Sequence, residues 1–143
     1  MRGAARHQPS SDDREFQRAL EACEITPAAF DHAAHVRLAY VYLCSDTVDE
    51  SVRRMKASLL AFLAHLGVGG AKYHETLTRA WIMAVDHFMT KSSPCPSAAA
   101  FMADNPALLD SRIMLTHYSA ATLFSPEARQ AFVPPDIQPI PPD

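Results

Sequence analysis

Apolar residues recur every three or four positions over four long stretches of the chain, a spacing that predicts amphipathic helices. The clearest stretch follows Thr47, where Thr-Val-Asp-Glu matches a capping box and apolar positions continue at helical spacing to Leu66. Gly67 then suits the end of this helix, because glycine readily adopts the left-handed backbone that often follows one. The other three are predicted from Ser11 to before Thr26, from Pro27 or Asp31 to Leu43, and from Tyr73 to Met89.

Shorter helices are predicted in the last third of the chain. Ser97 can cap one to Met102, a further piece begins at Asn105-Pro106, residues 110–124 read as helix, and Ser125-Pro126-Glu127 begins a last one to Phe132. No stretch shows the alternation expected of a strand. The sequence therefore predicts an all-α, single-domain bundle of about four main helices with short C-terminal helices.

The domain limits follow from where the helical pattern begins and ends. At 143 residues the chain is of ordinary single-domain length. Residues 1–10 lack an apolar period and are predicted to be a flexible N-terminal arm, and residues 11–132 form the bundle. Residues 133–143 contain five prolines and are predicted to be an extended tail.

Histidines replace aliphatic residues at the N-terminal ends of two predicted apolar faces. His32 and His35 lie one turn apart at the start of the second helix, and His74 lies at the start of the fourth. Short links make consecutive helices antiparallel, so the second and fourth begin at the same end of the bundle. We therefore expect the three imidazoles to meet in one polar pocket.

Three imidazoles that meet in this way are typical of a metal site with an open coordination position. We expect His32, His35 and His74 to bind a divalent transition metal ion, and the ligand type does not choose among zinc, copper, iron and manganese. A structural interpretation stays open, in which one histidine bonds to a backbone carbonyl in the core and another lies on the surface.

Other polar residues near these histidines are candidates for further roles. Glu75 can be a fourth ligand, a partner that orients an imidazole, or a general base acting with His74; it can equally be an acid that favours the helix dipole. The substrate pocket is expected to include Thr78, Tyr73 and His117. Thr78 has the best helical position of the three.

Composition excludes several classes of partner. The formal net charge is −3 with no basic stripe, so nucleic acid is not expected. No apolar run approaches the length that spans a membrane, and no secretory signal is recognisable. The three cysteines have no paired spacing, which favours free thiols and a cytoplasmic location. No feature separates a monomer from a homo-oligomer.

The pairing of residues 30–39 (FDHAAHVRLA) with residues 72–81 (KYHETLTRAW) resembles a pattern in small, uncharacterised all-helical bacterial proteins. The resemblance extends over about Phe30 to Trp81, with a further likeness in the tail from Pro135 to Pro141. It implies that His32, His35, His74 and Glu75 act as a functional set, and it implies no particular reaction.

The sequence as a whole favours a metal-dependent enzyme acting on a small molecule. Two helix N-termini facing the pocket would favour an anionic group on that molecule. A metal-free enzyme using a His–Glu pair for acid–base chemistry is the second hypothesis. A non-enzymatic helical module for ligand binding or protein interaction is the third.

Overall fold

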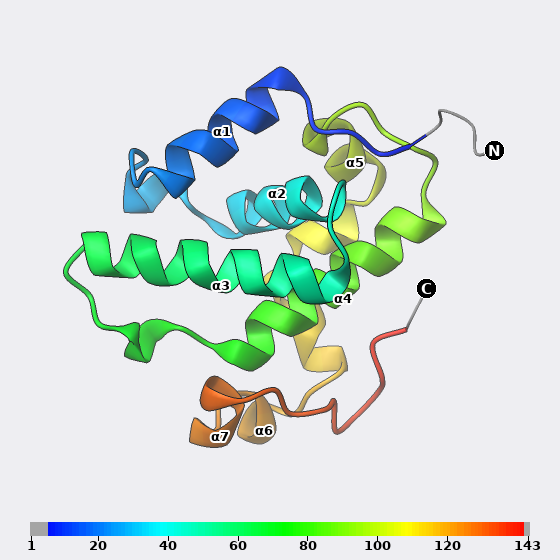
Figure 1. Ribbon diagram of the computed structural model, residues 1–143. Coiled ribbons are helices and arrows are strands. Elements are labelled where there is room, and N and C mark those ends of the chain that lie inside the picture. Colours follow the sequence, from blue (N-terminus) through cyan, green and yellow to red (C-terminus); the bar gives the residue numbers. More distant parts are fainter. Residues whose placement is uncertain (1–5, 142–143) are drawn as a thin grey trace.

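Helices are the only regular elements in residues 6–141, the part of the chain that the computed structural model describes. The longer ones are α1 (Ser11–Glu21), α2 (His32–Leu43), α3 (Val48–His65) and α4 (Glu75–Lys91), shown in Figure 1. The remaining ones are η1 (Pro27–Ala29), η2 (Gly70–Lys72), α5 (Ala98–Asp104), η3 (Pro106–Leu109), η4 (Ser111–Thr116), α6 (Ala120–Leu123) and α7 (Pro126–Gln130). The predicted all-α, single-domain fold is confirmed.

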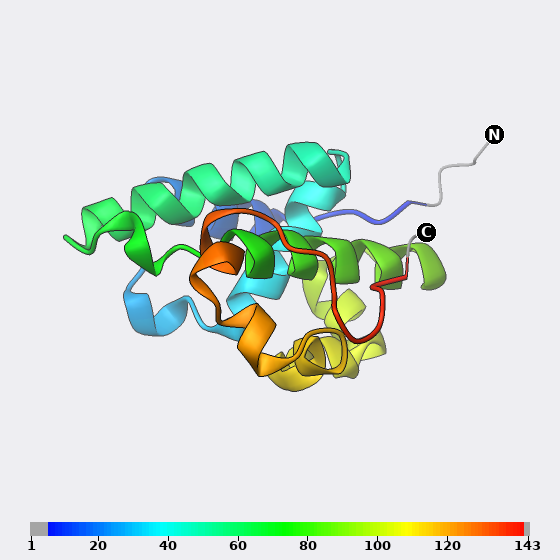
Figure 2. The ribbon, with the colours of Figure 1, turned by 90° about the horizontal axis from the view of Figure 1, so that it is seen from below.

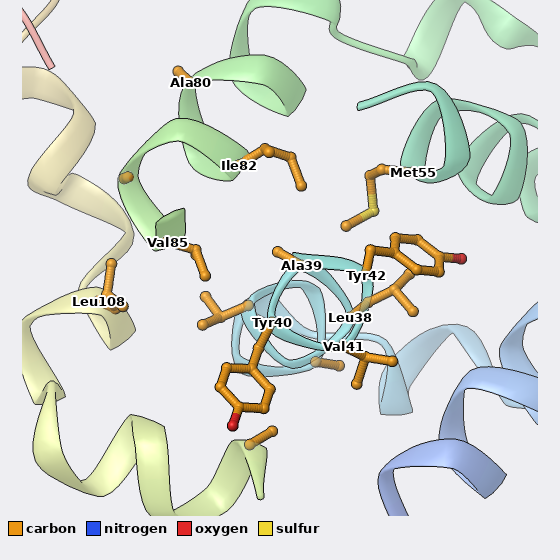
Figure 3. Packing of buried hydrophobic residues seen from close by; sticks show 14 of the residues in the cluster. Leu38, Ala39, Tyr40, Val41, Tyr42, Met55, Ala80, Ile82, Val85 and Leu108 are labelled. Atoms are coloured by element: carbon orange, nitrogen blue, oxygen red, sulfur yellow. The ribbon is translucent and has the colours of Figure 1, made fainter. Parts of the chain in front are cut away.

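Helix α2 lies at the centre of the fold. Figure 3 views it end-on, with side chains of α3, α4 and η3 packed around it. The five consecutive residues from Leu38 to Tyr42 are all buried, so this half of the helix has no solvent face. A helix that is apolar on every side needs neighbours on every side, and α2 contacts α1, α3, α4, α5 and η3.

Several helices begin after a polar residue whose side chain caps the first turn. Thr47 Oγ1 accepts a hydrogen bond from the Glu50 amide while the Glu50 carboxylate accepts one from the Thr47 amide, which confirms the predicted capping box. Ser10 and Asp13 form a second box at α1. These bonds satisfy amide groups that the first turn of a helix leaves unpaired.

Helices α2 and α4 run in the same general direction, and α3 runs in the opposite direction (Figure 1). The short link 44–47 favours antiparallel packing of α2 and α3, and the link 66–74, which contains η2, leads the chain back to α4. The start of α2 therefore lies beside the start of α4, as the sequence predicted.

The predicted helix over residues 110–124 is wrong, since the chain there forms η4 and α6 with a break between them. Tyr118 lies at the break, fully buried, and its hydroxyl donates to the Val133 carbonyl at 2.6 Å. Asp136 accepts a hydrogen bond from the Ser119 amide at 2.8 Å. These bonds to the tail replace those that a continuous helix would make.

Both predicted terminal segments touch the body where the structure describes them. Gln8 donates its amide to the Cys95 carbonyl at 2.9 Å, and Ile140 in the tail is buried. Figure 2 shows the chain after α7 crossing the underside of the molecule. Residues 1–5 of the predicted arm and 142–143 of the predicted tail lie outside the described residues.

Candidate functional site

A pocket of about 720 Å³ opens between α2, α3, α4, η4 and α6. Its wall is mostly apolar, with Met55, Leu59, Phe62, Leu63, Leu77, Trp81, Ile82, Val85 and Leu123 among the lining residues. His32, His35 and His74 all line it, so the predicted convergence of the three histidines on one pocket is found in the structure. What each imidazole can do depends on which ring nitrogens are already bonded.

His74 uses both ring nitrogens to hold the fold together. It is the N-cap residue of α4, where Nδ1 accepts the Leu77 amide at 3.1 Å. Its Nε2–H donates to the Leu123 carbonyl at 2.7 Å. Because an amide can only donate and a carbonyl can only accept, these partners fix a neutral ring with the proton on Nε2.

Burial lowers the pKa of His74 from its usual 6.5, and the positive charge of Arg129 acts in the same direction. Protonation would place a hydrogen on Nδ1 against the Leu77 amide. The neutral ring is therefore the form that the folded protein needs, and it has no lone pair left for a metal ion or a substrate proton.

His35 leaves one nitrogen free. Its Nδ1–H donates to the Asp31 carbonyl at 3.0 Å, and its ring stacks on Phe30 with centroids 4.0 Å apart. Nε2 has no hydrogen-bond partner within residues 6–141, and it is not a buried atom, so it faces accessible space. Burial lowers the pKa of His35, and neighbouring His32 adds to the effect, so Nε2 presents a lone pair at neutral pH.

In His32 the ring nitrogen that forms a hydrogen bond is Nε2, whereas in His35 it is Nδ1. The His32 Nε2–H donates to the Leu108 carbonyl at 2.9 Å, and the ring meets Trp81 edge-on with centroids 4.5 Å apart. The acceptor nitrogen Nδ1 has no partner among the described residues and is not enclosed. Two unpaired imidazole nitrogens are thus available in this part of the pocket.

These contacts do not build the three-histidine metal centre expected from the sequence. Within residues 6–141, no three His, Cys, Asp or Glu side chains are grouped so that they can hold a metal ion. His74 has no free nitrogen, and the Asp31 carboxylate caps α2 by accepting the Ala34 amide at 2.9 Å. The donor set therefore does not fit the expected ion, whose presence stays a prediction.

Glu75 lies outside the pocket lining. Its Oε1 accepts a hydrogen bond from the Tyr73 hydroxyl at 3.0 Å and lies 3.5 Å from Lys56 Nζ. Within residues 6–141 no hydrogen bond joins Glu75 to the His74 ring, since both His74 nitrogens bond to backbone groups. The structure gives Glu75 the contacts of a first-turn acid paired with surface groups.

Of the three residues predicted to line the substrate pocket, two line it in the structure and one does not. Tyr73 and Thr78 line the pocket, although the Thr78 hydroxyl is already donated to the His74 carbonyl at 2.9 Å. Burial raises the pKa of Tyr73, so its hydroxyl stays protonated. His117 does not line the pocket; its Nδ1 bonds to the Gln138 carbonyl at 2.8 Å and helps to hold the tail.

The sequence analysis did not identify Trp81 as part of the pocket wall. The signal was present, because Trp81 lies two turns after His74 on the same helical face. The carbonyl partners of the histidines, Leu108 and Leu123, carry no sequence signal, since every residue has a carbonyl group.

No protein-family model, curated protein or solved structure matches this chain. The interpretation of the site therefore rests on its own geometry. In the described part of the chain, no helix has the length and apolar character needed to cross a membrane.

Proposed function

We propose that the pocket binds a small, mostly apolar molecule that carries a hydroxyl or amino group. The observation that carries the proposal is the presence of two unpaired imidazole nitrogens, His35 Nε2 and His32 Nδ1, in an otherwise apolar cavity. An apolar wall with a few fixed polar groups is the usual form of a small-molecule site. Because both nitrogens are acceptors in the neutral rings, the complementary ligand group is a donor.

An anionic group receives less support than the sequence suggested. The first turns of both helices already have acceptors, since Asp31 caps α2 and His74 caps α4. Arg112 at the pocket edge is paired with Asp110 at 3.0 Å. Lys72 also lines the pocket and forms no ion pair within residues 6–141, so an anionic group would have one cation to meet. The two imidazole acceptors favour a neutral donor.

The second candidate is metal-free acid–base catalysis, with His35 rather than the His74–Glu75 pair as the base. The Asp31 carbonyl fixes the proton on Nδ1 of His35, and Nε2 is left facing the cavity. A neutral imidazole held in one tautomer is the arrangement that general bases use. The metal-dependent alternative is tested by elemental analysis of the untagged protein.

The binding proposal is tested by the fluorescence of Trp81, which is the single tryptophan in the chain and lines the pocket. Two matched probes, 4-butylcyclohexanol and butylcyclohexane, differ by one hydroxyl group and are titrated into the protein. We expect both to change the emission saturably, with the alcohol binding about 3- to 10-fold more tightly because it gains a hydrogen bond to His35.

The variant His35→Leu supplies the control. Its preference for the alcohol over butylcyclohexane should fall by about 3- to 10-fold relative to the parent, since the His35 acceptor is gone while His32 Nδ1 and the apolar wall remain. Saturable binding of butylcyclohexane shows in the same experiment that the variant pocket is intact. An alcohol preference in His35→Leu equal to that of the parent would contradict the assignment to His35, and no saturable response to either probe would contradict ligand binding.

A further inference from the structure

A second cleft, of about 390 Å³, lies between the segment 6–9, α1, the end of α2 and α3. Val41 of α2 and Cys44, which follows the helix, form part of its wall, whereas Val36 and Ala39 of α2 face the first pocket. The two sites therefore lie on opposite sides of the central helix, and the chemistry proposed for the first pocket does not involve the second.

Arginines dominate the charge of this cleft. Arg6, Arg14 and Arg54 line it, and none of its lining residues is an aspartate or a glutamate. The chain as a whole carries a formal net charge of −3, so the concentration of positive charge is local. Like charges that converge on one cavity repel each other unless an anion lies between them.

Arg54 is the fixed cation of the three. Its guanidinium lies 2.9 Å from Asp46 and 3.6 Å from Glu21, and it stacks over the Tyr42 ring at 4.3 Å. These contacts occupy only some of the five N–H donors of the guanidinium, so other donors remain for a ligand. Because these contacts already fix the Arg54 side chain beside the cleft, binding a ligand would cost it little additional conformational entropy.

The side chains of Arg14 and Arg6 are exposed to solvent. Neither forms an ion pair or a side-chain hydrogen bond with any residue in the range 6–141. Arginine forks match the geometry of phosphate and carboxylate oxygens, and they can bind both oxygens of one group at once.

The other polar groups of the cleft add no negative charge. His7 bonds through both ring nitrogens, to the Met89 carbonyl at 2.7 Å and to the Cys95 amide at 3.1 Å. Burial raises the pKa of Cys44 to about 11, so its thiol is not charged. The carboxylates of Asp46 and Glu21, which pair with Arg54, lie outside the lining, so the wall of the cleft itself presents no carboxylate to an incoming anion.

We propose that this basic cleft is a second binding site, for a small oxyanion such as the phosphate or carboxylate group of a metabolite, held by Arg14, Arg6 and Arg54. The anion would meet the arginine forks, and Val41 with the Cys44 thiol would contact a short apolar part of the same molecule.

The test is a nuclear magnetic resonance titration of ¹⁵N-labelled protein with inorganic phosphate, with ionic strength held constant by exchanging chloride. We expect saturable shifts of the Arg14 and Arg54 side-chain Nε–H signals. The variant Arg14→Gln should weaken phosphate binding by about tenfold, because it removes a charge-assisted pair. Arg14 is exposed and makes no side-chain bond, so this variant should fold.

Arg53→Gln is the matched control, since it makes the same charge change at an exposed α3 position outside the cleft lining. It should leave phosphate affinity within about twofold of the parent. Shifts that grow without saturation, or an equal loss of affinity in Arg53→Gln, would overturn the proposal, because both would show that phosphate senses only overall charge.

Discussion

Each histidine in the first pocket acquires its role from the groups that its two nitrogens meet. His74 bonds to one amide and one carbonyl, so its ring is occupied as a helix cap. His35 bonds to one carbonyl only and keeps an acceptor facing the cavity. The same side chain at equivalent ends of two helices is therefore structural in one case and available to a ligand in the other.

Substitution of His74 should reduce stability in a graded way. His74→Ala removes the cap of α4 and leaves the Leu123 carbonyl without its donor, which should cost about 2–4 kcal/mol of unfolding free energy. His74→Asn keeps a good cap residue and should recover about 1 kcal/mol of that loss. Urea unfolding measures both variants. Two variants as stable as the parent would contradict the structural role.

The pH dependence of stability should change in the same variants. A histidine whose pKa is lower in the folded state contributes stability above its unfolded pKa, near 6.5, and this contribution is lost as pH falls through the folded pKa. His35 acts in the same direction. We expect the parent to lose stability as pH falls below about 6.5, and His74→Asn to lose less over that window.

The place of each residue was easier to predict from the sequence than its bonds. Helical spacing put His32, His35 and His74 correctly on faces that meet, because periodicity determines direction. It did not reveal that Leu108 and Leu123 carbonyls lie within bonding distance of two of the rings. Those contacts come from the C-terminal segment, whose path depends on tertiary packing.

At the scale of elements, the contact between α1 and α2 depends on one buried carboxylate, that of Asp13. Asp13 accepts hydrogen bonds from the Ser10 amide at 2.9 Å and the Ala98 amide at 2.8 Å, and from Arg37 Nε at 2.8 Å. Burial alone would raise the pKa of Asp13, but these donors together hold it below its usual 3.8. One side chain therefore links α1, α2 and the start of α5.

Replacing this carboxylate should be costly, because Asp13→Asn leaves Arg37 without its anion and turns amide hydrogens toward donors. We expect a loss of about 3–5 kcal/mol in unfolding free energy near neutral pH. The parent should also lose stability as pH falls below about 3.8, where the unfolded carboxyl protonates first, and Asp13→Asn should lack that step.

Asp12→Asn provides the control in the same helix turn. Asp12 is exposed, so its removal should cost less than about 1 kcal/mol, through the helix dipole alone. Chemical denaturation curves recorded between acidic and neutral pH measure all three proteins. Equal losses in Asp12→Asn and Asp13→Asn would show that the buried network has no special role.

Element boundaries that depend on local chemistry could be predicted, and those that depend on distant contacts could not. The capping box at Thr47 and Glu50 is a local signal and is present in the structure. The central position of α2 was not predicted. Arg37, a charged residue in the middle of α2, is half-buried against Asp13, a contact that the local pattern does not show. The break at Tyr118 depends on bonds to the tail, which no local pattern encodes.

At the scale of the whole molecule, α2 separates two cavities with different chemistry. The first is apolar and presents neutral imidazole acceptors, and the second is lined by arginines. All-α class and helix order were predictable because short links constrain a bundle. Of the first cavity, only the meeting of its three histidines was predicted. The second cavity was not predicted, since it is bounded by segments far apart in sequence whose side chains show no shared pattern.

The most direct test of the proposed site is the protonation state of each imidazole, read from long-range ¹H–¹⁵N correlations at mildly alkaline pH. We expect His74 to carry its proton on Nε2 and His35 to carry its proton on Nδ1. Adding 4-butylcyclohexanol should shift His35 Nε2 and leave the His74 nitrogens unchanged. A His74 ring protonated on Nδ1, bound to metal or shifted by the alcohol, with His35 unchanged, would contradict this assignment.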